Sequence, residues 1–367
     1  MKATDLTSIR PPIPRFRNSE RMAIRTLGML IAASVSAACS GHETVQSEYK
    51  TPEPPPVVLE QKMFLWSREA GFAYIPAQPG VNNVPYGIND LGEVVGTTVF
   101  GPNRGGTFVW SASTGFRYLD SAGVPASVAM SINTSGSVTG FIQGSSFRRA
   151  FVWSRNAGVT ILPDVGGIPL IGSAGHAINS RGEIAGNIIR DTIFTAFRWS
   201  SEAGTHLLRG TSELVNTFAV DMNDTGEVIG YDGVWEGWDP VLSQRSAILW
   251  SPDGKPTDLF PECRRKCDVD LASINSRGEV AGTIGKRAFR RSTAGVVTSM
   301  PGSDVTWARG MNDEGDVIVA VSIGMQLGKA SLWTVNGDVI ELRGPPEVSA
   351  IYPHAINNKG VVVGTVR

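Results

Sequence analysis

The sequence has little of what would point to a particular chemistry. Its 33 lysines and arginines balance 34 aspartates and glutamates, leaving a formal net charge of -1, so nothing electrostatic favours nucleic acid as a partner. No nucleophile elbow, HExxH helix or phosphate-binding loop is present. The sequence therefore predicts no cofactor and no metal site, and it does not indicate a reaction.

Aromatic residues are also scarce, at 8%, whereas glycine occurs 42 times and proline 22 times. Many glycines and prolines favour turns between short strands over long helices. An all-β fold is the first expectation from composition.

The N-terminal segment differs from the rest of the chain. Five arginines precede an apolar run at residues 27–38, and about a dozen apolar residues suit a signal peptide but not a bilayer span. We predict a signal peptide at 1–38, with Met22 as an alternative start. The following polar, proline-rich residues 39–61 predict an extended tether. Residues 62–367 are expected to form the folded domain.

The segment "VSAAC", Val35 to Cys39, resembles the lipobox of bacterial lipoproteins, with Ser36 where leucine is usual. The resemblance implies that Cys39 is lipidated and that several acyl chains anchor the protein without a membrane span. An ordinary signal peptide, with Cys39 incidental, is the alternative. The expected location is the cell envelope, as an outer-membrane or surface lipoprotein, and otherwise the periplasm or the medium.

The other two of the three cysteines are Cys263 and Cys267. An even pair in an exported protein predicts a disulfide. A zinc site is the rival, but two thiols without a nearby histidine lack four ligands.

One phrase recurs through the domain, as in "AINSRGEIAG" at residues 177–186 and "SINSRGEVAG" at 273–282. Asparagine followed three residues later by glycine is typical of a type I turn closed by a left-handed residue. Short alternating apolar segments flank each turn, so each copy predicts a β-hairpin. The asparagines of the seven copies are Asn89, Asn133, Asn179, Asn223, Asn275, Asn312 and Asn357.

A second phrase, such as "FVWSRNAG", alternates with the first and predicts a second hairpin. Its tryptophan, expected in the core, occurs in six copies, at Trp66, Trp110, Trp153, Trp199, Trp250 and Trp333, while Arg291 replaces it in one.

Two hairpins per repeat give seven four-stranded sheets with apolar residues on both faces. Radial stacking covers both faces, so we predict a seven-bladed β-propeller. The domain opens with an unpaired second phrase and closes with an unpaired first phrase, so the N- and C-terminal hairpins are expected to share the last blade. An open solenoid is the alternative, but it would not explain this complementarity.

The phrases "AFVW" at residues 150–153 and "INDLGEVVG" at 88–96 resemble the units of the HAF-repeat family of extracellular bacterial proteins. The resemblance covers residues 62–367 and implies secretion and a propeller-like fold, but no activity or site residue. Repeat six departs from the pattern at Arg291 and Val319, so an irregular blade is expected there.

Binding function is expected in the variable connections, which lie opposite the repeated turns. The longest is "YDGVWEGWDPVLSQRS" at residues 231–246. Its candidate ligand-binding residues are Asp232, Trp235, Glu236, Trp238 and Asp239, because tryptophan is frequent at interaction hot spots. Alternatively, the tryptophans fold back onto blade four.

Two repeated polar positions are weaker candidates. Equivalent acidic residues could form a ring for a cation or be solvated residues beyond the turn. His176 and His354, each in "HAIN", could satisfy local hydrogen bonds. The acidic residues are Glu93, Glu183, Glu227, Glu279 and Asp316.

The functional prediction is a monomeric binding or scaffold module whose variable face engages a partner protein or glycan. The alternative is a glycan-active hydrolase or lyase using carboxylates at the mouth of the central channel. A close carboxylate pair there would favour the enzyme, and a tryptophan shelf without one would favour binding.

Overall fold

The computed structural model describes residues 61–76, 81–99, 105–119, 126–144, 148–163, 172–190, 193–211, 216–234, 244–263, 267–323 and 326–367. The predicted signal peptide, Cys39 and all of the tether except its last residue, Gln61, lie outside these residues. Within the described part of the chain, no helix is long and apolar enough to cross a membrane.

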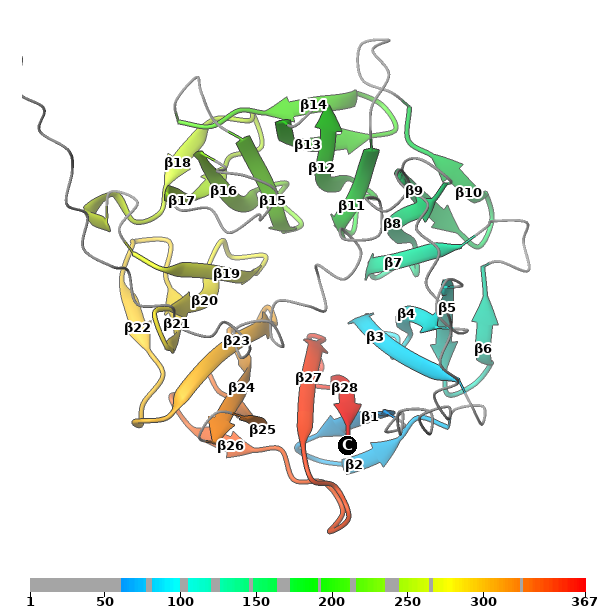
Figure 1. The fold of residues 1–367 in the computed structure, drawn as a ribbon, viewed down its shortest axis with the longest axis vertical. Coiled ribbons are helices and arrows are strands. Elements are labelled where there is room, and N and C mark those ends of the chain that lie inside the picture. The colour runs from blue at the N-terminus through cyan, green and yellow to red at the C-terminus, as the bar shows by residue number, and fades with distance from the viewer. Residues whose placement is uncertain are drawn as a thin grey trace, which may run out of the picture. The chain divides into compact units, whose positions relative to one another are not determined.

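Seven blades of four antiparallel strands form the described part of the domain (Figure 1), and one parallel pairing of Gly172 with Arg148 joins blades 2 and 3 into an eight-stranded sheet. Blade 1 is β3 (Asn82–Ile88), β4 (Val94–Val99), β5 (Gly105–Ser111) and β6 (Gly115–Tyr118); blade 2 is β7 (Ser127–Ile132), β8 (Val138–Gln143), β9 (Arg148–Ser154) and β10 (Gly158–Ile161). Blade 3 is β11 (Gly172–Ile178), β12 (Ile184–Arg190), β13 (Ile193–Ser200) and β14 (Gly204–Leu208); blade 4 is β15 (Asn216–Met222), β16 (Val228–Val234), β17 (Gln244–Trp250) and β18 (Pro256–Asp258). Blade 5 is β19 (Val269–Ile274), β20 (Val280–Ile284), β21 (Arg287–Arg291) and β22 (Val297–Ser299); blade 6 is β23 (Val305–Met311), β24 (Val317–Ile323), β25 (Gln326–Trp333) and β26 (Val339–Glu341).

Blade 7 joins the two ends of the domain. Its strands, from the axis outward, are β27 (Ile351–Ile356), β28 (Val362–Val366), β1 (Lys62–Ser67) and β2 (Gly71–Tyr74). Strand β28 pairs with β1 in antiparallel register, with Phe64 opposite Gly364. The predicted seven-bladed propeller and its closure by terminal hairpins are therefore confirmed.

The innermost strands, β3, β7, β11, β15, β19, β23 and β27, surround the axis, and each contacts the next around the ring (Figure 1). Buried apolar clusters lie between neighbouring blades. One joins Phe64 and Val362 of blade 7 to Ile318 of blade 6. The core is thus a ring of interfaces, and each blade needs both neighbours to bury its two faces.

A glycine in the second strand of most blades has a steric role. A Cβ at Gly96 would lie 2.2 Å from the carbonyl oxygen of Val84 and 2.6 Å from the ring of Phe108. Phe108 is the residue opposite Gly96 on β5 and is fully buried. The phrases therefore specify a small residue on one strand and a large one opposite.

The two departures from the repeat lie in different blades, and both blades keep four strands. Blade 6, which holds Val319, is irregular: the register between β24 and β25 shifts between Val321 and Ser322. In blade 6, the large and small residues exchange strands. Val319 takes the glycine position on β24, and the small Ser331 lies opposite it on β25.

In blade 5, the Nε of Arg291 donates to the carbonyl of Leu259 at 3.0 Å. In blade 4, the tryptophan at the same repeat position, Trp250, donates its Nε1–H to the carbonyl of Arg209 at 2.6 Å. Arg291 therefore supplies the N–H donor that the tryptophan supplies in blade 4.

All six repeated tryptophans are buried, between 0% and 9% exposed. They are core residues, as the repeat predicts.

Candidate functional site

The blades have two different ends. The first and second strands are joined at one end by the asparagine turns, and the third and fourth strands are joined at the same end. We call this end the turn face. The opposite end of the blades, where β16 ends at Val234 and β17 begins at Gln244, we call the connection face.

Each asparagine of the turn face stabilises its own turn. The Oδ1 of Asn89 accepts the backbone N–H groups of Leu91 at 3.1 Å and of Glu93 at 2.9 Å. Gly92 has a φ of 75°, a left-handed conformation that glycine adopts without steric cost. This confirms the turn chemistry read from the sequence.

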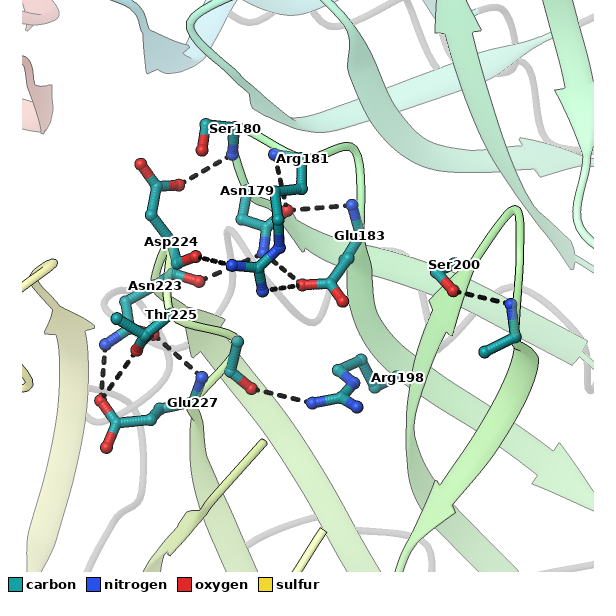
Figure 2. Close-up of polar contacts among 12 residues, drawn as sticks. Asn179, Ser180, Arg181, Glu183, Arg198, Ser200, Asn223, Asp224, Thr225 and Glu227 are labelled. Carbon is teal, nitrogen blue, oxygen red and sulfur yellow. Dashed lines mark hydrogen bonds and ion pairs between the residues drawn. The ribbon is translucent and has the colours of Figure 1, made fainter. Parts of the chain in front are cut away.

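The same asparagines also join the blades. The Nδ2 of Asn179 donates to the carbonyl of Asn223 in the next blade at 3.3 Å, and Asn357 donates to Asn89 across the closure at 2.9 Å (Figure 2 shows the first pair). Equivalent bonds link Asn89 to Asn133, Asn133 to Asn179 and Asn223 to Asn275. All seven asparagines are between 3% and 5% exposed. We call these five bonds between blades the asparagine ring. The sequence interpretation missed them, although a turn uses only the Oδ1 and leaves the amide donors available.

The repeated carboxylates belong to this network. The Oε2 atoms of Glu183 and Glu227 each accept the Nδ2 of their own asparagine at 2.7 Å, and Arg181 also bonds Glu183 (Figure 2). Burial works to raise the pKa of Glu183, but hydrogen bonds from Asn179 and Arg181 outweigh it, and the pKa is lowered. Glu93 is only 5% exposed, so it is not a solvated residue.

Within the described ranges, no group of three histidine, cysteine, aspartate or glutamate residues could hold a metal ion. The repeated acidic residues instead stabilise the asparagine turns, because their carboxylates accept the asparagine amides.

On the connection face, Asp232 is the only one of the five predicted binding residues among those described. It is fully buried on β16, and its Oδ2 accepts the backbone N–H and the hydroxyl of Thr211, both at 2.7 Å. These bonds tie the strand to the connection between blades 3 and 4. Trp235, Glu236, Trp238 and Asp239 lie outside the described residues, so their ligand-binding role stays a prediction.

The cysteine pair forms the expected disulfide. Cys263 ends the 3-10 helix η3 (Pro261–Cys263), and its sulfur lies 2.05 Å from that of Cys267. Both side chains pack against the apolar cluster between blades 4 and 5. The bridge thus secures the connection between these two blades.

A charged cluster lies beside this bridge. The guanidinium of Arg245 is 4.3 Å from the ring centroid of Tyr231 and forms ion pairs with Asp270 and, at 3.8 Å, with Asp268. Burial raises the pKa of Tyr231 to about 12, so its hydroxyl stays protonated while it accepts the N–H of Leu271. Two carboxylates therefore meet at the connection face, and one half-buried cation bridges them.

Along the axis, buried and half-buried residues alternate on the innermost strands. Each of these strands has a β-bulge, and the bulged side chains are all half-buried. We call these residues, with the half-buried residues two positions earlier, the channel wall. The bulged residues are Tyr86, Met130, His176, Val220, Ala272, Arg309 and His354.

The channel wall is polar on one side. The residues two positions before the bulge are aliphatic in blades 1 to 3 and then Phe218, Asp270, Trp307 and Tyr352 in blades 4 to 7. Together with Arg309 and His354, charged and aromatic side chains gather in blades 5 to 7.

Both histidines of the "HAIN" phrase lie in the channel wall. His176 is 5.2 Å from Phe218, centroid to centroid, and the Nε2 of His354 is 3.2 Å from the hydroxyl of Thr365. Burial lowers the pKa of each to about 4, and the charge of Arg309 adds to the effect at His354. Both imidazoles are therefore neutral at pH 7.

A pocket of about 240 Å³ lies on the turn face, between blades 6 and 7. Arg68 and Lys359 line it together with Glu69, Glu314 and Asp316. Its position was not predicted, because its charged residues come from turns that are adjacent only in the closed ring.

No protein-family model and no curated protein matches the chain. Among solved structures, it is similar to the β-propeller domain of the Trilobed protease from Pyrococcus furiosus, with a TM-score of 0.52 and 13% identity over 75% of this chain and 86% of that one. It is also similar to virginiamycin B lyase from Staphylococcus aureus (TM-score 0.49, 12% identity, 84% and 100% covered) and to a putative TolB from Agrobacterium tumefaciens (0.47, 11%, 84% and 98%). At such low identity, the similarity shows the β-propeller fold alone.

Proposed function

We propose that this protein is a binding or scaffold module of the cell envelope, exported and anchored by lipid at Cys39. It engages a partner protein or glycan through its connection face. The resemblance to the HAF-repeat family is part of this proposal, because it implies an extracellular location.

The contrast between the two faces is the observation that carries the proposal. The turn face repeats one hydrogen-bonded turn in every blade, and its asparagine amides are used between blades. The described part of the connection face holds the disulfide and the Arg245 cluster, and the strands that flank the predicted binding loop, β16 and β17, end and begin there. Variable loops on a rigid scaffold are where binding residues concentrate.

The experiment is a pulldown from cell-envelope extracts and glycan arrays. The full chain is compared with a variant in which a short glycine-serine link replaces residues 235–243. The excision is confined to these residues because 231–234 and 244–246 belong to β16 and β17. Loss of a captured partner with an unchanged unfolding midpoint supports the proposal. If the excised variant still captures the partner, the proposal that residues 235–243 bind it is contradicted.

Substitution of Lys359 by alanine on the turn face is the matched control. Lys359 is exposed and lies far from the connection face along its blade. Its removal should leave capture unchanged.

The alternative, a glycan-active hydrolase or lyase, has one specific observation in its favour. Asp268 and Asp270 form a carboxylate pair at the connection face, although both contact Arg245. Such chemistry needs one carboxyl group to donate a proton, whereas both of these carboxylates are ion-paired with Arg245. Turnover of envelope glycans by the wild type, abolished by Asp270→Asn, would favour the enzyme.

A further inference from the structure

At four interfaces between blades, a glutamate closes the space next to a turn glycine. The Oε2 of Glu183 accepts the Nδ2 of Asn179 at 2.7 Å (Figure 2), and a Cβ at Gly226, in the next blade, would lie 3.4 Å from that oxygen. Three further pairs of glutamate and glycine repeat this arrangement. They are Glu93 with Gly136, Glu227 with Gly278, and Glu279 with Gly315. A carboxylate therefore occupies the same position at each of these interfaces.

The interface between blades 6 and 7 lacks this closure. Asp316 is one methylene shorter than the glutamate of the repeat, and its Oδ1 accepts the N–H of Val335 at 2.8 Å. A Cβ at Gly360, the corresponding glycine of blade 7, would have no heavy atom within 4 Å. The pocket of about 240 Å³ lies here, with Asp316, Val335 and Gly360 in its lining. The space that a glutamate fills elsewhere is thus open.

The asparagine of the same turn has an unused donor. The Oδ1 of Asn312 accepts the N–H of Asp316 at 2.8 Å, so the turn itself is kept. Among the hydrogen bonds of the described residues, none is donated by its Nδ2, whereas the other six asparagines each donate at least one. This includes the two turns in which Ser137 and Val361 replace the glutamate. Asn312 is 3% exposed, and its Nδ2 is not among the polar atoms enclosed without a partner, so this donor is accessible from the surface.

The pocket offers charges of both signs. Arg68 and Lys359 line it, and neither takes part in an ion pair among the described residues. Its acids are Glu69, Glu314 and Asp316, which exceed the cations by one. An anion alone would meet this excess of negative charge. A molecule that carries both a carboxylate and an ammonium group can instead pair with the cations and with the acids.

We propose that the pocket between blades 6 and 7 binds a small aliphatic α-amino acid. Its carboxylate takes the position of the missing glutamate and accepts the Nδ2 of Asn312, and its ammonium group pairs with the acids. Leu332 and Val335 give the lining an apolar part for the side chain. The volume lies below the roughly 300–1,000 Å³ of pockets for drug-sized ligands, which fits a molecule of this size. The inference goes beyond the partner proposal, because it concerns the turn face.

The test is isothermal titration of the full chain at pH 7 with L-valine, valinamide and N-acetyl-L-valine. Valinamide lacks the carboxylate, and N-acetyl-L-valine lacks the ammonium group. We expect L-valine to bind at least tenfold more tightly than either. Equal affinity for one of the two analogues, or no binding of L-valine at millimolar concentration, would overturn the inference.

A variant that restores the repeat tests the position of the site. Asp316→Glu should fill the space beside Gly360 and lower the affinity for L-valine at least tenfold. The unfolding midpoint should stay unchanged or rise, because glutamate is the residue at this position in four other blades. Asp253→Glu, the same change at an exposed position on the turn face of blade 4, is the matched control and should not alter binding. Binding that survives Asp316→Glu would contradict the inference.

A second variant guards against a folding defect. Lys359 is exposed, so Lys359→Ala should weaken L-valine binding without moving the unfolding midpoint, and unchanged binding would count against the site. The same variant should leave capture through the connection face intact, and excision of 235–243 should leave L-valine binding intact. The amino-acid site and the partner proposal can therefore fail separately.

Discussion

Replacing Asn223 by aspartate separates the two roles of the asparagine ring. The variant keeps the Oδ1 that accepts the N–H of Glu227 at 2.9 Å and the hydroxyl of Thr225 at 2.7 Å. It loses the Nδ2 that donates to Glu227 at 2.7 Å and to the carbonyl of Asn275 at 3.0 Å (Figure 2 shows the bond to Glu227). The turn is therefore retained while the link from blade 4 to blade 5 is broken.

The expected loss is large for a nearly isosteric change. Each buried acceptor left without its donor costs about 1–3 kcal/mol. The new carboxylate would also face Glu227 at hydrogen-bond distance, where like charges repel by about 5 kcal/mol at an effective dielectric constant of 20. Partial exposure of Glu227 screens that repulsion. We expect a total loss of about 2–5 kcal/mol in unfolding free energy at pH 7.

Urea unfolding followed by tryptophan fluorescence measures the effect against wild type at the same pH. The matched control is Asn336→Asp, the same change at an exposed turn position, which should cost less than about 0.5 kcal/mol. At pH 4.5 the gap between Asn223→Asp and wild type should narrow, because a protonated carboxyl can donate again. A loss below about 0.5 kcal/mol at pH 7 would refute a stabilising role for the ring. So would a gap that does not depend on pH.

The remaining predictions test anchoring, closure, the disulfide and pH dependence. Cys39→Ser should move the protein from the membrane fraction to the soluble fraction, because acylation needs the thiol; unchanged partitioning would remove the lipoprotein interpretation. Deleting Ala355–Arg367 should cause global unfolding or aggregation in a thermal melt, because β28 pairs with both β27 and β1; a modest shift with full solubility would contradict a closed ring. Cys263→Ser should cost only about 2 kcal/mol, since the loop is short, and thiol labelling of the native oxidised protein at this cysteine would contradict the disulfide. His176 and His354 have a pKa of about 4 against an ordinary 6.5, so the folded state binds fewer protons than the unfolded chain and stability falls as pH drops from 6.5 towards 4. Between pH 7.5 and 5 the loss should be about 2 kcal/mol for each histidine, and glutamine at both positions should remove it.

The strands, turns and blade number follow from the sequence alone. An asparagine followed by glycine three residues later defines a turn through contacts within five residues, and alternation of apolar residues defines the flanking strands. The incomplete repeats at the two ends required a shared blade, and β28 pairs with β1 accordingly. These features are local or repetitive, so they can be recognised in the sequence without knowing which residues are neighbours in space.

Contacts between blades were decided by the tertiary structure. Asn357 reaches Asn89, 268 positions away in sequence, only because the ring closes. In the sequence, Arg291 is only a departure from the tryptophan pattern. The structure explains it, because its Nε donates to the carbonyl of Leu259. The sequence identified His354 as a repeat position but gave no sign that Arg309 and Asp270, from two other blades, share its channel. Which side chains meet along the axis depends on the bulges and on the packing of seven sheets around a common centre, and neither is encoded within one repeat.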